Sequence, residues 1–221
     1  MEASLPFNRI HVVDMNVAIE EASEASGEGT FVTLKNLRKS LPTDAWADLE
    51  DRQSNLCKVI LSAEFGCEET DSDDPKINAD YLKMWALLHC KGNNKEKAVA
   101  FYEILQEGGL SAHEQISATD KDFIPSFLKI VQFASCDVIK FSVEVLGEEK
   151  LYSDDEVKKL TDPETIVDIR EDIWLEDVYG ATARLANDAW LEACSKGGNW
   201  IFKPEELRKK IWEETKVEKK H

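Results

Sequence analysis

The chain has 221 residues, 43 % of them hydrophobic, and a formal net charge of −17 from 44 acidic against 27 basic residues. Because nucleic acids and anionic membrane surfaces are negative, this charge argues against unaided binding to either and favours cations or basic protein segments, although solubility alone explains it equally well. No apolar run approaches the roughly 18 residues of a membrane span, and the opening MEASLPFNRI lacks the pattern of a signal peptide.

Helical periodicity dominates the first half of the chain. Apolar spacing predicts a helix over residues 11–21, with Val13, Val17 and Ile19 on its apolar side, and a second over 34–41 that ends before Pro42. A third helix is predicted to start at Thr43, and others cover 80–90, 95–106 and 120–134. The acidic segment between 67 and 79, CEETDSDDPKINA, is predicted to be a loop.

The second half continues with helices and lacks long strands. Helices are predicted over 136–146, from about 163 to 177, over 182–194 and from 204 onwards. Strand-like runs are two or three residues long, and they are TFV at 30–32, QIS at 115–117 and WIF at 200–202. These patterns predict an all-α fold in two packed halves, residues 1–135 and 136–221.

These three short runs share one order of elements: a glycine-containing polar loop, one apolar residue in an extended segment, and then a helix. The phrases are FVTLKNLRKSL, QISATDKDFIPSFL and WIFKPEELRKKI. In these places the chain resembles the EF-hand superfamily, in which the apolar residue at loop position eight pairs two loops in a short bridge. The resemblance implies that Phe31, Ile116 and Ile201 are such pairing residues, in EF-hand-like helix–loop–helix pairs.

The same alignment tests the first loop for calcium. With Phe31 at position eight, the candidate oxygen ligands at positions one, three, five and seven are Glu24, Ser26, Glu28 and Thr30. Position twelve, which should carry a carboxylate with two ligand oxygens, is Lys35. A lysine ammonium has no lone pair and repels a cation. We therefore expect calcium to bind here weakly or not at all.

The other loops keep the apolar residue but lose the ligands in different ways. With Ile116 at position eight, the entry positions are Gly109, Ser111 and His113. With Ile201 there, the entry positions are Cys194, Lys196 and Gly198. The acidic run 71–74 has the oxygens, but Pro75 stands where a ligand should fall, so we interpret this run as a solvated loop. No cofactor is expected with certainty, and calcium only at low affinity.

No catalytic constellation is recognisable. The histidines share no spacing with each other or with a cysteine, and the chain has neither GxGxxG nor GxxxxGK[ST]. Five scattered cysteines without a CxxC pair predict reduced thiols and a cytoplasmic protein. We expect no enzymatic activity, no catalytic residues and no nucleic-acid or membrane partner.

EF-hand pairs commonly open a groove for a partner helix, and an acidic rim would favour a basic amphipathic one. The candidates for such a groove are Trp85, Phe123 and Phe127. The leading hypothesis is a non-enzymatic, EF-hand-like protein that binds a protein or peptide and has degenerate calcium loops. The alternatives are an all-helical scaffold unrelated to EF-hands and a helical enzyme with an unrecognised site.

Overall fold

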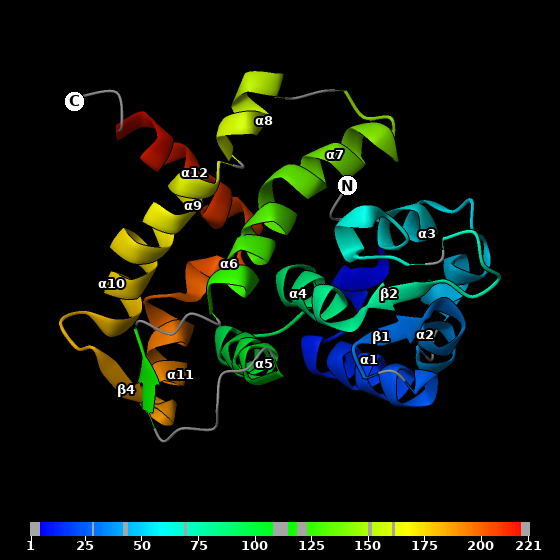
Figure 1. Ribbon diagram of the computed structural model, residues 1–221, viewed down its shortest axis with the longest axis horizontal. Coiled ribbons are helices and arrows are strands. Elements are labelled where there is room, and N and C mark those ends of the chain that lie inside the picture. The colour runs from blue at the N-terminus through cyan, green and yellow to red at the C-terminus, as the bar shows by residue number, and fades with distance from the viewer. Residues whose placement is uncertain are drawn as a thin grey trace. The chain divides into compact units, whose positions relative to one another are not determined.

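The computed structural model describes residues 5–27, 29–41, 44–68, 70–107, 115–118, 123–149, 152–160 and 162–217. The predicted all-α fold is confirmed: within these residues the strands form only two sheets, each of two strands (Figure 1). Contacts divide the chain into unit 1, residues 1–92 with 140–149, and unit 2, residues 93–139 with 150–221. The division into halves at residue 135 stays a prediction.

None of the helices in this described part of the chain has the length and apolar character that crossing a bilayer requires.

Unit 1 contains two helix–loop–helix segments, each with a short strand before its second helix (Figure 1). The first is α1–β1–α2 and the second is α3–β2–α4. In chain order the elements are η1 (Pro6–Arg9), α1 (Val12–Ser26), β1 (Phe31–Thr33), α2 (Leu34–Ser40), η2 (Asp44–Glu50), α3 (Asn55–Ile60), η3 (Ala63–Phe65), β2 (Lys76–Asn78) and α4 (Ala79–His89).

The two loops of unit 1 meet in an antiparallel bridge between β1 and β2. Its central pair is Val32 opposite Ile77, and both side chains are 0 % exposed. Phe31 lies in β1 but is only half-buried, opposite Asn78. Phe31 therefore does pair across the bridge, but the prediction that it is buried was wrong, and the buried residue at the centre of the bridge is Val32. Because side chains alternate across a strand, Phe31 lies off the core face and Val32 lies on it.

Both second helices of unit 1 begin directly after their strand, at a capping side chain. Thr33 accepts a hydrogen bond from the backbone N–H of Asn36 at 3.3 Å, and Asn78 accepts one from that of Tyr81 at 3.0 Å. Such caps satisfy backbone donors that a helix leaves unpaired in its first turn. The strand and the helix are therefore held in one fixed register at each loop.

Helix α1 buries one face against α2 and α4 and leaves the other open. It ends at Gly27, whose left-handed backbone, with φ at 75°, favours glycine. The predicted apolar side was partly wrong: Ile19 is buried, whereas Val13 and Val17 are exposed by 48 % and 47 %. The buried face has the helical spacing of Val12, Met15, Asn16, Ala18, Ile19, Ala22 and Ser23.

Trp85 of α4 lies fully buried in the core of unit 1. Its ring centroid lies 5.3 Å from that of Phe65, 6.1 Å from Phe7 and 5.9 Å from Phe141, which belongs to the returning segment 140–149. Phe7 in turn contacts Trp46 edge to face at 5.1 Å. Four aromatic rings and the indole of Trp85 thus join η1, η2, η3, α4 and the returning segment.

Unit 2 is built from longer runs of helix around a second short bridge. Two of its helical runs contain a π-helical turn, η4 and η5. From residue 93 onwards the elements are α5 (Asn94–Glu107), β3 (Gln115–Ser117), α6 (Phe123–Gln132), η4 (Phe133–Asp137), α7 (Val138–Glu144), α8 (Asp154–Leu160), α9 (Pro163–Asp168), η5 (Ile169–Trp174), α10 (Leu175–Tyr179), β4 (Arg184–Ala186), α11 (Asn187–Lys196), η6 (Asn199–Phe202) and α12 (Pro204–Val217). Helix α7 belongs to unit 1 from residue 140 on.

The bridge of unit 2 joins β3 to β4, with Ile116 opposite Leu185. Ile116 is buried and extended, as the sequence predicted. Ile201 is buried too, but the prediction of an extended segment there was wrong, because η6 is a 3-10 helix. Its backbone closes on itself: the N–H of Ile201 donates to Gly198 at 3.4 Å and that of Lys203 to Trp200 at 3.1 Å.

Trp174 lies at the centre of the core of unit 2. Phe123 stacks on it at a centroid distance of 4.5 Å, and Phe127, Trp190 and Phe101 lie at 6.1, 6.2 and 6.3 Å. These rings come from α5, α6, η5 and α11, so one aromatic cluster ties the helices on both sides of the β3–β4 bridge.

The bridge of unit 1 makes a first prediction. Replacing Ile77 with alanine removes a fully buried side chain between the two loops and should lower the free energy of unfolding by about 2–5 kcal/mol. Urea unfolding of the full chain, followed by circular dichroism, measures this change. Phe31→Ala is the control and should lower stability by less, because Phe31 is half-buried. A larger loss for Phe31→Ala than for Ile77→Ala would contradict the observed register.

Candidate functional site

The first loop of unit 1 is closed by two serine hydroxyls from the last turns of α1. Ser26 Oγ accepts hydrogen bonds from the backbone N–H of Thr33 and from Asn36 Nδ2, each at 3.1 Å. The same hydroxyl donates to the carbonyl of Ala22 at 2.6 Å. Ser23 Oγ donates to the carbonyl of Gly29 at 2.8 Å. Protein donors therefore occupy the hydroxyl that the sequence placed among the metal ligands.

The second loop of unit 1 holds the first from the other side. Asp74 Oδ1 accepts a hydrogen bond from the backbone N–H of Lys35 at 2.9 Å, so this carboxylate binds the first turn of α2. The backbone N–H of Leu34 donates to Pro75 at 3.1 Å, and that of Ala79 donates back to Thr30 at 2.9 Å. Each second helix thus begins with a hydrogen bond to the opposite loop.

A basic side chain binds the acidic loop itself. The guanidinium of Arg52, which lies between η2 and α3, donates from Nη1 to the carbonyl of Thr70 at 3.1 Å and from Nη2 to the carbonyl of Ser72. With Ile77 at loop position eight, Thr70, Ser72 and Asp74 fall at positions one, three and five. The positively charged guanidinium of Arg52 therefore contacts the loop at positions where an EF-hand would present ligands to calcium. Sequence reasoning missed Arg52, since nothing in its spacing connects it to this loop.

Three of the four proposed ligands of the first loop lie within the described residues, and two of these are bound to protein groups. Glu24 is exposed, Ser26 is bound as described, Thr30 uses its carbonyl for Ala79, and Glu28 lies outside the described residues. With Val32 at position eight, the entry positions become Ala25, Gly27 and Gly29 and position twelve becomes Asn36. Across the described residues, no group of three or more His, Cys, Asp or Glu side chains is placed to hold a metal ion.

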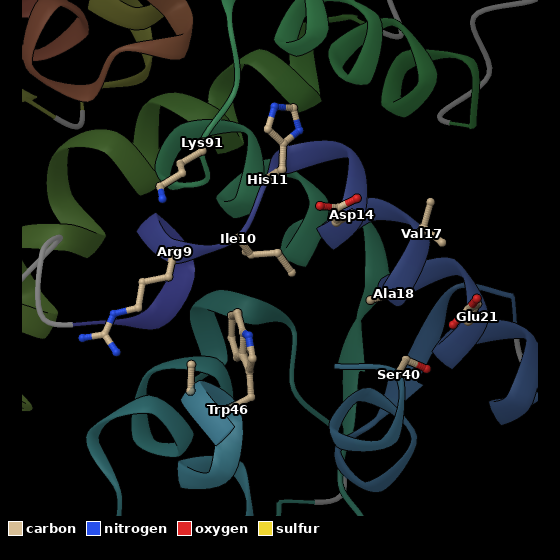
Figure 2. A pocket seen from close by; sticks show the side chains of 11 residues that line it. Arg9, Ile10, His11, Asp14, Val17, Ala18, Glu21, Ser40, Trp46 and Lys91 are labelled. Atoms are coloured by element: carbon tan, nitrogen blue, oxygen red, sulfur yellow. The ribbon is translucent and has the colours of Figure 1, made fainter. Parts of the chain in front are cut away.

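A groove with a cavity volume of about 560 Å³ runs along the open side of α1 (Figure 2). It lies wholly within unit 1, between α1, the end of α2 and the start of η2. Its lining residues are Arg9, Ile10, His11, Asp14, Val17, Ala18, Glu21, Ser40, Ala45, Trp46 and Lys91.

The groove combines an apolar floor with charged ends. Ile10 and Trp46 line its floor, and Val17 borders it with a half-exposed side chain (Figure 2). Arg9 and Lys91 lie toward one end, whereas Glu21 lies toward the other (Figure 2). The groove therefore presents both apolar surface and charges of both signs to solvent.

A short backbone bridge fixes the basic end of the groove. The N–H of Val12 donates to the carbonyl of Lys91 at 2.7 Å, and the N–H of Lys91 donates to that of Ile10 at 2.9 Å. This bridge ties the start of α1 to the residue after α4. The backbones that carry Arg9, His11 and Lys91 are therefore held together before any ligand arrives.

The three groove candidates from the sequence lie elsewhere. Trp85 is in the core of unit 1, and Phe123 and Phe127 are in the core of unit 2; none of them lines this groove. The residues that do line it were missed because α1 has apolar residues on both of its sides. The signal that could have found them is Val17, an apolar residue on the face of α1 opposite Met15 and Ile19.

A smaller cavity of about 390 Å³ in unit 2 lies between α8 and α12, lined by Tyr152, Leu160, Glu205, Arg208, Lys209 and Trp212. Arg208 Nη1 is already bound to the carbonyl of Ala134 in the π-helical turn η4, at 2.6 Å. The guanidinium therefore links α12 to η4, and this cavity is the weaker candidate for a binding site.

Three of the five cysteine thiols have a raised pKa. All five cysteines are unpaired with each other, and burial raises the pKa of the Cys57, Cys67 and Cys194 thiols. A thiol with a raised pKa stays protonated near neutral pH and is a poor nucleophile. These three side chains act as small apolar residues of the fold.

Comparisons of the chain with protein-family models, with curated proteins and with solved structures find no match.

The closure of the first loop predicts the effect of removing one hydroxyl. Ser26→Ala leaves the N–H of Thr33 and the amide of Asn36 without their acceptor, so the free energy of unfolding should fall by about 1–3 kcal/mol. Urea unfolding measures it. Ser40→Ala is the matched control, because this serine of α2 is half-buried and its hydroxyl has no hydrogen bond within the described residues. Equal stability of the two variants would show that Ser26 does not hold the loop.

The loop contacts also make a prediction for calcium. Because Arg52, Ser26 and the Asp74 carboxylate are bound to protein groups, the metal-stripped chain should bind calcium no more tightly than about millimolar. Isothermal titration calorimetry with calcium and then magnesium measures the affinity, and Asp74→Asn serves as the matched variant. A micromolar site in the unmodified chain that Asp74→Asn abolishes would contradict the prediction.

Proposed function

We propose that the chain is a non-enzymatic, EF-hand-like protein that binds a helical segment of a partner protein in the α1 groove and does not need calcium to do so. The observation that carries the proposal is Val17, a large apolar side chain 47 % exposed at the edge of a 560 Å³ groove. Exposed apolar surface beside a groove with a polar rim is typical of sites where proteins bind one another.

The EF-hand relationship, which is part of this proposal, is supported by the arrangement of unit 1. Two helix–loop–helix segments are joined by one antiparallel bridge, with Val32 opposite Ile77, and each second helix starts directly after it. The same order occurs at β3 and β4 in unit 2. EF-hands pair in this way through the residue at loop position eight. The loops would then be degenerate hands that retain the bridge.

Independence from calcium is supported by the contacts that already close the loops. In sensor EF-hands, the ion changes the angle between the two helices of a hand and so exposes a groove. Here Ser26, Arg52 and Asp74 bind protein groups. The α1 groove would accordingly be open at all times, and binding would be regulated by the supply of partner, not by metal.

The proposed partner is a basic amphipathic helix, and charge is the reason. The chain has a net charge of −17, and Asp14 and Glu21 lie along the groove, with Glu24 exposed on the next turn of α1. Acidic side chains on the rim attract basic partners and speed their association. Reduced cysteines agree with a cytoplasmic location for both proteins.

The proposal predicts a partner contact at position 17. A photo-reactive amino acid placed there should cross-link a partner in extracts of the source cells. The same amino acid at Val99, a valine of α5 that is 37 % exposed in unit 2, is the matched control and should not cross-link it.

Binding of that partner to the purified full chain should weaken at least about tenfold with Val17→Asp, since a buried charge replaces an apolar contact. Val99→Asp should leave the affinity unchanged, and circular dichroism should confirm that both variants fold. A partner that binds both variants equally well would rule out the α1 groove as its site.

A further inference from the structure

We infer that the α1 groove selects its partner helix by the order of charges along it: acidic residues in the first turn and basic residues in the last, with the helix running parallel to α1. The inference rests on the proposed function, because it names the chemistry of the segment bound at the same groove.

Opposite charges lie at the two ends of the groove. Arg9 and Lys91 lie by the N-terminus of α1, and Glu21 lies toward its C-terminus (Figure 2). Asp14, in the first turn of α1, offsets one of the two basic charges at that end and leaves it net positive, and Glu21 lies seven residues further along α1, about 10 Å or two helical turns. The groove therefore spans a distance over which the first and last turns of a short partner helix contact different charges.

The four charged groups are available for a partner. Within the described residues, no ion pair engages Arg9, Asp14, Glu21 or Lys91. The neighbouring Glu20 differs, because it pairs with the buried Lys83 at 3.4 Å and so belongs to the packing of α1 on α4. Charges at a surface groove that have no partner within their own unit are suited to setting the orientation of a bound segment.

The order of charges decides the orientation of the helix. A helix is itself stabilised by acidic side chains in its first turn and basic ones in its last turn. Such a helix, laid parallel to α1, puts its acidic turn at Arg9 and Lys91 and its basic turn at Glu21. In the reverse direction, its basic turn would face Arg9 and Lys91. Full side-chain charges outweigh the half charges of helix ends, so the parallel orientation is favoured.

A displayed peptide library on the full chain tests this order directly. The library consists of helices of about 14 residues, four turns, with a fixed apolar stripe and with Glu, Lys or Gln at every other position. Selection is carried out in parallel on the unmodified chain, on Val17→Asp and on the double variant Arg9→Glu with Lys91→Glu. The selected peptides are then synthesised, each with a twin in which every Glu and Lys is exchanged.

The expected result is enrichment of Glu in the first turn and Lys in the last on the unmodified chain. Each selected peptide should bind about tenfold more tightly than its charge-exchanged twin, and added salt should reduce this ratio. The double variant should lose the preference for Glu in the first turn.

Two other outcomes overturn different statements. Helices that depend on Val17 but show no charge order, or the reverse order, would overturn this inference and leave the proposed function standing. Failure to enrich any helix over Val17→Asp would overturn the proposed function, and the inference with it.

Discussion

The arrangement of unit 1 depends on one buried contact, the packing of Val32 against Ile77 where the two loops meet. Both side chains are withdrawn from water, and the strands that carry them are only three residues long. The pair therefore fixes the register of both loops at once. Since α2 and α4 begin at the next residues, the same contact also fixes where these helices start. Reciprocal hydrogen bonds, from Leu34 to Pro75 and from Ala79 to Thr30, lock the two loops to each other.

The groove follows from this arrangement. With the loops joined, α1 packs its buried face against α2 and α4, and Val13 and Val17 on its opposite face remain exposed. Serine hydroxyls, an aspartate and an arginine close the loops, and in the function proposed here these contacts hold the loop geometry without a metal ion. In the function proposed here, the bound partner meets a preformed surface, and its affinity does not include the free energy of opening a pair of helices.

The sequence was sufficient for the fold class and for Ile116, because helical periodicity is strong and the short apolar runs are flanked by loops and helices. It was insufficient where two neighbouring apolar residues compete. Phe31 and Val32 both fit the pairing position, and only the packing of Ile77 decides between them. The prediction of an extended backbone at Ile201 was wrong because the segment forms the local hydrogen bonds of a 3-10 helix instead of those of a bridge. The groove could not be predicted from the aromatic candidates, since Trp85 and Phe127 are core residues and the large exposed apolar residue beside the groove is Val17.

The central claim is that the loops of unit 1 are closed by protein groups and not by a metal ion, and amide hydrogen exchange tests it most directly. The amides to follow are those of Thr33, Leu34, Lys35 and Ala79, in chelator and then with added calcium. The account predicts that all four are protected in chelator, because each donates to a protein acceptor, and that calcium leaves their rates unchanged. Rapid exchange in chelator that becomes slow on adding calcium would contradict it.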